Sequence, residues 1–381
     1  MKRLTLDPRP DWRAKVEALG LVWHTASNGE AYWNESAAYS FTGGEIASIE
    51  AATAELYRLF LEAGERIVRD DRMLARFGIP PAFRTAVRAA WDAEPPALNH
   101  GRFDLGFDGS GPPVLFEFNC DTPTSMLETA VVQWAWKEEV FPGLDQYNSL
   151  HDKLSARWRA VAPSLPDRHV WFCHVDDAMG EDTVTCAYLR DVARAAGIDS
   201  TPIRMEDIGW DAGAGRFADL DERAITAMFH LYPWEWLANE AGATAIVDSL
   251  DSTLWIEPVW KMLWSNKAVL AVLWEMFPGH PNLLPAKFNR PTFDHVSKPF
   301  LLREGANVTI TRRGEEAAAT GGDYGAEGFV HQALFTLPDF DGKRPVIGAW
   351  IVDGEPAGLG VREGGLVTDN TAAFVPHVIE G

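Results

Sequence analysis

Cysteine is scarce in this sequence. Its 381 residues contain three cysteines, Cys120, Cys173 and Cys186. An odd number cannot all pair with one another, and their spacing matches no metal-binding pattern. Unpaired thiols are typical of a reducing compartment, so we expect a cytoplasmic protein without structural disulfides.

Long apolar segments are also missing. No run approaches the roughly 20 apolar residues that are needed to cross a bilayer. The opening residues, MKRLTLDPRPDW, lack the apolar core of a signal peptide. We therefore expect neither export nor a membrane partner.

Basic residues are outnumbered, with 34 Lys and Arg against 55 Asp and Glu, which gives a formal charge of −21. No basic stripe is visible, and binding to nucleic acid needs one because the phosphates must be neutralised. The sequence therefore predicts no nucleic-acid partner. The acidic balance is compatible with a cationic partner such as an amine, although it can equally serve solubility alone.

The chain is longer than a single typical core, which predicts two or three packed lobes. Apolar residues recur three and four apart over residues 42–70, which predicts a long amphipathic helix. A second helix is predicted over residues 80–94, with proline in its first turn. Residues 102–119 then form two alternating segments around DGSGPP, which is typical of a β-hairpin.

The middle of the chain alternates between strand and helix. Ser125 to Glu128 matches a capping box at the start of a helix that should stop at residues 141–143. Strand, helix and strand then follow over residues 169–236, which predicts a small α/β domain with a parallel sheet. Residues 258–277 are predicted to be helical, and the strand-like runs after them predict an antiparallel sheet. We expect the α/β domain to interrupt a larger catalytic unit.

Polar side chains alternate along the second strand of the hairpin. Strand side chains repeat with period two, so Glu117, Asn119 and Asp121 are predicted to project from one face. The opposite face is then expected to carry the apolar residues Val114, Phe116 and Phe118. A half-buried edge strand with solvated polar groups would show the same pattern.

The first strand of the hairpin adds Arg102 and Asp104 on one face. Oxygen ligands from two neighbouring strands suit a hard cation such as Mg²⁺, and an arginine beside them can grip a phosphate or carboxylate. A salt bridge between Arg102 and Glu117 is the structural alternative.

Two lysines occupy informative positions. Lys267 follows a helix-like run, and Lys298 ends a strand shortly before a turn that contains Gly305. A lysine beside a small glycine-containing turn suits an anion that backbone N–H groups can approach closely. The alternative for each is a solvated surface lysine.

Four long blocks resemble one known family. FEFNCDTPTSMLETAVVQW, EPVWKMLWSNKAVLAVLWEMFPGHPNLLPA, KPFLLREGANV and LPDFDGKRPVIGAWIVDGEPAGLGVRE are similar to the glutathionylspermidine synthase family. The resemblance runs from about Trp12 to Ile379. It implies an acid–amine ligase with a permuted ATP-grasp fold of the α/β (α+β) class and an inserted small α/β pre-ATP-grasp domain. We expect the synthetase module without the amidase domain of the bifunctional members.

The resemblance implies three parts. Residues 1–150 would hold the metal-binding hairpin, residues 151–245 would be the inserted α/β substrate domain, and residues 246–381 would supply the lid and the nucleotide-binding part. Magnesium would be bound by Asp104, Glu117 and Asn119, beside the phosphate-binding, catalytic Arg102. Arg362 would lie near the reacting carboxylate, with a buried ion pair to Glu363 or Glu355 as its alternative.

The resemblance also implies where the substrates bind. Nucleotide contacts would come from Lys267, Lys298, Glu304, Gly305, Gln332, Ala333, Leu334, Phe335, Leu366, Val367 and Thr368. Thr122 and Thr124, with Ser125 adjacent, would hold the acid. Glu181 and Asp182 would receive the amine, although acidic loops are also common as solvated surface. Cys120 has no histidine near it in the sequence, which favours a structural thiol over a nucleophile.

These expectations combine into an ATP- and Mg²⁺-dependent ligase. ATP would phosphorylate the carboxylate of a peptide or amino acid, and an amine would attack the acyl phosphate, with a polyamine as one candidate for that amine. Two alternatives stay open: an ATP-grasp ligase for an unrelated peptide or cell-wall substrate, and a nucleotide-binding scaffold without turnover.

Overall fold

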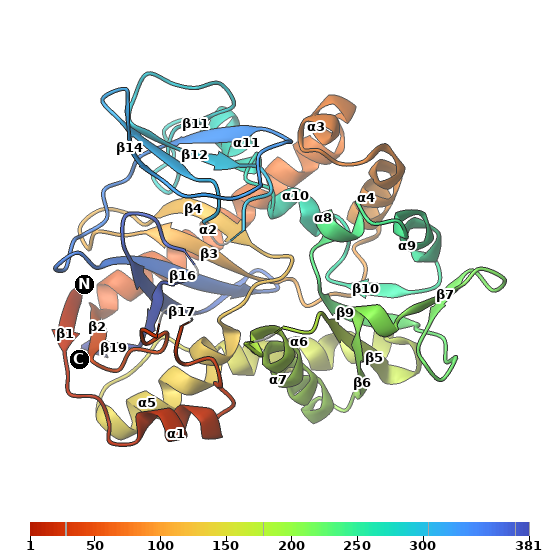
Figure 1. Cartoon of the computed structure of the whole chain (residues 1–381), viewed down its shortest axis with the longest axis horizontal. Coiled ribbons are helices and arrows are strands. Elements are labelled where there is room, and N and C mark those ends of the chain that lie inside the picture. The colour runs from red at the N-terminus through yellow and green to blue at the C-terminus, as the bar shows by residue number, and fades with distance from the viewer. Residues whose placement is uncertain (27–28, 178, 304, 370, 381) are drawn as a thin grey trace.

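Helices and strands mix throughout the chain, as predicted for an α/β protein (Figure 1). The structure is a computed structural model, and it describes residues 1–26, 29–177, 179–303, 305–369 and 371–380. Within these ranges no helix combines the length and the apolar character that crossing a membrane requires.

A five-stranded antiparallel sheet forms the centre of the molecule (Figure 1). In spatial order its strands are β18 (Ala373–Val375), β17 (Glu355–Gly364), β16 (Arg344–Val352), β3 (His100–Gly106) and β4 (Val114–Asn119). The predicted hairpin is confirmed as β3 and β4. Helix α2 (Gly43–Val68) packs against β16 and β17. It is the predicted long helix, and Thr42 and Glu45 cap its start reciprocally.

The predicted parallel sheet is confirmed. It contains β10 (Leu254–Ile256), β9 (Ala227–Leu231), β5 (His169–His174) and β6 (Asp199–Arg204) in that order. All neighbouring pairs are parallel. Helix α7 (Glu181–Ala195) covers β5 and β6, while α6 (Leu150–Val161) packs between α7 and β16 of the central sheet. This parallel unit therefore contacts the central sheet directly.

A second five-stranded sheet, here called the lid sheet, lies over the central sheet (Figure 1). Its order is β11 (Ala286–Lys287), β15 (Phe329–Ala333), β12 (His295–Pro299), β13 (Thr309–Arg312) and β14 (Glu315–Ala319). Every pairing is antiparallel, which confirms the predicted antiparallel sheet.

The helix predicted over residues 258–277 is broken in two. Its parts are α10 (Lys261–Trp264) and α11 (Val269–Met276). Asn266 accounts for the break, because its side chain accepts the Ala268 N–H and donates to the carbonyl of Phe77. Asparagine side chains compete with helical backbone bonds in this way. The break places Lys267 on an irregular segment beside the lid sheet, where its N–H donates to the carbonyl of Phe300.

The remaining elements join the ends of the chain and cover the sheets. β1 (Lys2–Thr5), β2 (Ala37–Thr42) and β19 (His377–Glu380) form a small sheet that brings the termini together (Figure 1). β7 (Gly209–Asp211) and β8 (Arg216–Ala218) form a separate hairpin. The other helices are α1 (Trp12–Ala18), α3 (Asp71–Arg76), α4 (Pro81–Ala93), α5 (Gln133–Val140), α8 (Trp234–Leu237) and α9 (Ala243–Ser249).

The capping box predicted from Ser125 to Glu128 is wrong. Ser125 has a positive φ of 66°, and the Glu128 carboxylate turns away from the helix start. Glu128 instead accepts hydrogen bonds from the Tyr32 hydroxyl at 2.7 Å and from Trp23 Nε1 at 3.1 Å. The chain then passes through a π-helical turn over Glu128–Val132 into α5, which ends at Val140 as predicted.

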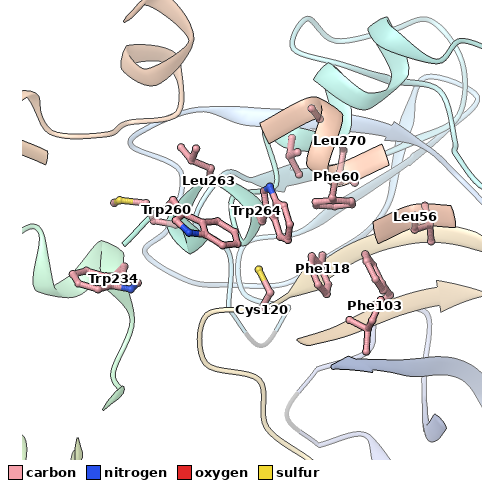
Figure 2. Packing of buried hydrophobic residues seen from close by; sticks show 14 of the residues in the cluster. Leu56, Phe60, Phe103, Phe118, Cys120, Trp234, Trp260, Leu263, Trp264 and Leu270 are labelled. Carbon is pink, nitrogen blue, oxygen red and sulfur yellow. The ribbon is translucent and has the colours of Figure 1, made fainter. Parts of the chain in front are cut away.

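The largest apolar cluster lies behind the β3–β4 hairpin (Figure 2). Phe103 and Phe118 stack with their ring centroids 3.8 Å apart, and Phe60 packs edge-on against both. Trp264 packs edge-on against Phe60 and lies tilted against Phe118. This packing fixes one face of the hairpin against α2 and α10. The other face is left for polar side chains.

A buried ion pair joins the central sheet to the parallel unit. Glu257 lies fully buried after β10, 3.0 Å from His100 Nδ1 at the start of β3 and 3.2 Å from Lys261 Nζ on α10. Burial alone would raise the pKa of Glu257, but Lys261 and His100 lower it to about 2.

We predict that Glu257→Gln lowers the free energy of unfolding by about 3 kcal/mol, because it leaves the buried Lys261 ammonium without its counter-charge. Urea unfolding at pH 7 measures this change. The pKa of Glu257 is depressed in the folded protein, so its contribution is complete above the ordinary pKa of 4.5 and is lost as the pH falls towards 2.

The matched control is Glu62→Gln on the exposed face of α2, where Glu62 pairs with Arg58. It should change the free energy of unfolding by less than about 1 kcal/mol. Equal stability of Glu257→Gln and the unchanged protein at pH 7 would show that the buried pair is not stabilising.

Candidate active site

One cavity of about 330 Å³ opens between the central sheet, the lid sheet and helix α8. Its walls come from segments that are distant in the sequence: the β3–β4 hairpin with the loop after it, one end of the parallel unit with α8, the segment around Lys267, the lid sheet, and the end of β17 with the residues that follow. Most of the residues predicted to carry function line this cavity.

Cross-strand pairing sets the floor of the cavity. Arg102 lies opposite Asn119, and Asp104 lies opposite Glu117. Directly opposed residues project from the same face of an antiparallel sheet, so all four side chains meet. The prediction that the two strands bring these residues together is confirmed.

Phe116 does not lie on the predicted apolar face. A β-bulge between Asp104 and Leu105 leaves Phe116 unpaired, so it turns into the cavity beside Glu117. Leu115, its neighbour in β4, is fully buried in the apolar core instead. An extra residue in one strand reverses the alternation beyond it, which the sequence pattern does not reveal.

Hydrogen bonds link the polar side chains of the floor. Arg102 Nε donates to Asp104 Oδ1 at 2.7 Å, so the ion pair that forms is not the alternative pair with Glu117. Asn119 Nδ2 lies 3.3 Å from Asp104 Oδ2 and 3.2 Å from Glu117 Oε1. The amide therefore bridges two carboxylates that would otherwise repel each other.

This donor set fits a hard cation. Two carboxylates and an amide supply oxygen ligands from adjacent strands, and Mg²⁺ is commonly held by one or two carboxylates together with substrate phosphates. Among the described residues no group of three or more His, Cys, Asp or Glu side chains is arranged to hold a metal. A metal at the hairpin would therefore need additional ligands from a substrate or from water.

Both candidate lysines reach the floor and neither is a solvated surface residue. Lys298 Nζ donates to the Phe116 carbonyl at 3.0 Å and to Gln332 Oε1 at 2.9 Å, and Lys267 Nζ lies 3.8 Å from Glu117 Oε2. Burial lowers the pKa of Lys298 to about 8. Burial would raise the pKa of Glu117, but the two lysine charges hold it below its ordinary value.

Most of the predicted nucleotide contacts line the cavity, namely Gly305, Gln332, Ala333, Leu334, Phe335, Leu366, Val367 and Thr368. Gln332 Nε2 donates to the Leu115 carbonyl at 2.7 Å, so this side chain joins the lid sheet to the hairpin. Gly305 has φ +69°, and a Cβ there would lie 2.9 Å from the Thr368 carbonyl oxygen. Only glycine fits that approach. Glu304 lies outside the described residues.

The loop after β4 carries the candidate acid site. Thr122 and Thr124 line the cavity, and Arg102 Nη1 donates to the Thr124 carbonyl at 2.6 Å. The Ser125 hydroxyl lies 3.3 Å from the Tyr32 hydroxyl. Burial raises the pKa of the Cys120 thiol to about 12, so it is a poor nucleophile, in agreement with the structural thiol that the sequence favours.

The acidic segment divides in two, because Asp176 and Asp177 lie before α7 whereas Glu181 and Asp182 are in its first turn. Asp177 accepts the Thr183 N–H and hydroxyl and so caps the helix. Asp182 lines the cavity, and Glu181 precedes it at the start of α7. Burial, together with the nearby charges of Glu128 and Asp182, raises the pKa of Glu181 to about 7.

Arg362 points into the cavity from β17. Its Nη2 donates to the Asp369 carbonyl at 2.6 Å, while Nε is buried without a hydrogen-bond partner. Neither alternative ion pair forms, because Glu363 is bonded to Arg3 and Glu355 to Lys153. An arginine with an unused buried donor can still receive an anion.

Sequence reasoning missed several residues of this site. Glu128 is fully buried, and its Oε2 has no hydrogen-bond partner. Its negative charge contributes to the raised pKa of Glu181. The spacing of Ser125 and Glu128 indicated a helix cap, so nothing in the sequence indicated that Glu128 belongs to the site. Arg303 and Glu235 also line the cavity as an ion pair of 2.8 Å, but they are 68 positions apart and nothing in their local sequence links them.

Comparison with known proteins identifies the family. The model described as glutathionylspermidine synthase preATP-grasp matches residues 3–380. A Haemophilus influenzae protein provisionally named an acid–amine ligase is 39% identical over 99% of both chains. The chain therefore belongs to the glutathionylspermidine synthase family and is an enzyme of the carbon–nitrogen ligase type, as the sequence predicts.

More distant relatives are longer. Trypanothione synthetase of Crithidia fasciculata is 28% identical, and the match covers 81% of this chain and 51% of that protein. The bifunctional glutathionylspermidine synthetase/amidase of Escherichia coli is 25% identical, and the match covers 85% of this chain and 56% of that protein. The chain thus matches about half the length of each. A glutathione synthetase-like effector from Globodera pallida shares the fold, with a TM-score of 0.58 at 11% identity over 98% of both chains.

Proposed function

We propose that this member of the family is an ATP-dependent ligase that joins a carboxylate to a primary amine through an acyl phosphate. The proposal rests on one observation: three cations and two carboxylates lie together at the floor of one cavity. They are Arg102, Lys267, Lys298, Asp104 and Glu117. Buried cations beside paired carboxylates are what a polyphosphate with its metal requires.

ATP is proposed to lie between the lid sheet and the central sheet, as in a permuted ATP-grasp fold. Lys267 and Lys298 would bind its phosphates, and Gly305 would let the backbone come close to them. The base would rest against Leu334 and Phe335 on one side and residues 366–368 on the other. We keep the division into parts 1–150, 151–245 and 246–381 as a proposal.

Phosphoryl transfer would take place above the hairpin. Arg102 is positioned by Asp104 to hold the transferring phosphoryl group, and the unused Nε of Arg362 is available to the reacting carboxylate. Asp104, Glu117 and Asn119 would hold Mg²⁺, which when bound screens the charge that builds up on the phosphates. Conversion of the carboxylate to an acyl phosphate replaces a poor leaving group by phosphate.

The amine would enter beside Glu181 and Asp182. The incoming ammonium must lose a proton before its nitrogen can attack. The carboxylate of Glu181 is suited to accept that proton, since its pKa of about 7 lies near the working pH. Glu128 lies behind Glu181 and adds negative charge that favours a cation. The names of the relatives mention glutathione and spermidine, and for this chain we propose a peptide or amino acid and a polyamine.

A screen of carboxylates crossed with amines, read by ADP release, tests the proposal as a whole. We expect ADP to appear only when an acid and an amine are both present. ADP release that never depends on an amine would contradict a ligase.

We predict that Lys298→Ala weakens the binding of Mg·ATP by about 1–3 kcal/mol, because a charged hydrogen bond to a phosphate is lost. Lys267→Ala should act in the same direction. Isothermal titration calorimetry measures both. The control is Lys343→Ala, an exposed lysine in the turn before β16, which should bind ATP normally. Unchanged affinity in both test variants would remove the phosphate assignment.

We predict that Asp104→Asn and Glu117→Gln fold normally and lose ADP release. Each change keeps the shape of the side chain and removes a charge that a metal needs. Asp108→Asn, in the turn of the same hairpin, is the matched control and should retain activity. Near-normal turnover at limiting Mg²⁺ would refute the metal role of that residue, and loss of the folded state would show a structural role instead.

We predict that Glu181→Gln/Asp182→Asn raises the KM for the amine and leaves the KM for ATP unchanged. In the unchanged protein the KM for the amine should fall as the pH rises from 6 to 8, since Glu181 becomes ionised through a pKa of about 7. The double variant should lose this dependence. Asp176→Asn, an exposed carboxylate in the loop before α7, is the control. An equal KM for the amine in the double variant would place the amine site elsewhere.

A further inference from the structure

A second hollow, of about 480 Å³, lies at the outer edge of the parallel unit. It is lined by His169 of β5, Arg190 and Arg194 of α7, and Asp199, Ser200 and Pro202 of β6. None of these residues lines the active-site cavity, and none has a role in the steps proposed above. The hollow is therefore a separate candidate site.

Small side chains on β6 explain why the hollow exists. β6 is the edge strand of its sheet and pairs with β5 alone, so that Ser200 lies beside Val170 and Pro202 beside Phe172. Neighbours in register project from the same face of a sheet, and this is the face that α7 covers. Val170 and Phe172 fill the space under the helix, whereas Ser200 and Pro202 are too small to do so at the edge.

Two arginines line the helix side of the hollow. Arg190 and Arg194 are four residues apart on α7, so they share one helix face. Arg194 lies in the last turn, where a positive charge suits the helix dipole, but Arg190 lies a turn earlier. Within the described ranges neither guanidinium has an ion-pair or hydrogen-bond partner. Although the chain has 55 acidic residues, none neutralises this pair, which leaves both cations for an anion from outside.

The strand side of the hollow offers a hydroxyl. Ser200 Oγ is buried without a hydrogen-bond partner. A buried hydroxyl without a partner is costly, and a bound oxyanion would accept its proton. His169 adds no positive charge near pH 7, because burial lowers its pKa, and its Nε2 lies 2.9 Å from Thr201 Oγ1. The positive charge of the hollow therefore comes from the two arginines.

The remaining carboxylate and the size of the hollow narrow the class of ligand. Asp199 is exposed and lies beside His169 in register. It would repel a bare anion, but it can accept a hydrogen bond from a hydroxyl or amino group. A volume of about 480 Å³ lies within the range of roughly 300–1,000 Å³ that is typical of sites for small organic molecules. An anionic group attached to a small polar organic part satisfies both features.

We infer that this hollow binds a phosphate monoester. The phosphate accepts hydrogen bonds from Arg190, Arg194 and Ser200, because planar guanidinium groups match phosphate oxygens well. The organic part donates a hydroxyl or amino group to Asp199. Sugar phosphates and nucleoside monophosphates share this chemistry. The inference is independent of the proposed ligase function, since it uses no residue of the active-site cavity.

Calorimetric titration of the full chain with glucose 6-phosphate, AMP and inorganic phosphate tests the inference. At least one monoester should bind, and Arg190→Gln/Arg194→Gln should weaken its binding at least about tenfold, because charge-assisted hydrogen bonds are lost. The control is Arg13→Gln/Arg159→Gln, which removes two exposed arginines of α1 and α6 and changes the net charge equally. It should bind the monoester normally. Equal loss in both double variants would show a general charge effect and overturn the inference.

Two further variants separate this hollow from the active site. Lys298→Ala should retain monoester binding. If it abolished that binding instead, the monoester would occupy the ATP site and the inference would be wrong. Ser200→Val fills the hollow with a residue that suits a strand, and it should also weaken the monoester about tenfold in a protein with an unchanged melting temperature. Inorganic phosphate that bound as tightly as both monoesters would contradict recognition of the organic part. No binding that depends on Arg190 and Arg194 would overturn the site.

Discussion

The register between β3 and β4 is the constraint on which the rest of the structure depends. It sets Arg102 opposite Asn119 and Asp104 opposite Glu117, while the stacked rings of Phe103 and Phe118 face the core. A slip by one residue would bury the charges and expose the rings, so apolar packing against α2 and Trp264 holds the polar face in place (Figure 2). The bulge beyond Asp104 then turns the Phe116 carbonyl to Lys298 and ties the lid sheet to the same hairpin.

The electrostatics of the cavity follow from that floor. Three of its cations lie within 4 Å of a carboxylate: Arg102 pairs with Asp104, Lys267 with Glu117, and Arg303 with Glu235. Such pairs keep the residues ionised in the absence of a ligand and hold them in place for charge brought by substrates. A sequence at −21 thus concentrates several of its cations at one cavity.

Local pattern was sufficient to predict α2, the hairpin, the parallel sheet and the antiparallel lid sheet, because each rests on periodicity or turn chemistry that neighbouring residues carry. Local pattern was insufficient where a side chain finds its partner in a segment that is distant in the sequence. Glu128 fits a capping box by spacing, yet Tyr32 and Trp23 bind its carboxylate. Asn266 breaks a run that reads as one helix. Arg303 and Glu235 could not be paired from the sequence, since only the fold brings them together.

The central claim is that the carboxylate is activated as an acyl phosphate in this cavity. The most direct measurement uses an acid substrate whose reacting carboxylate is labelled with ¹⁸O, incubated with ATP, Mg²⁺ and the amine. If the carboxylate attacks the γ-phosphorus, one labelled oxygen leaves with the released phosphate, and mass spectrometry detects it there. Release of unlabelled phosphate during amide formation would contradict the account.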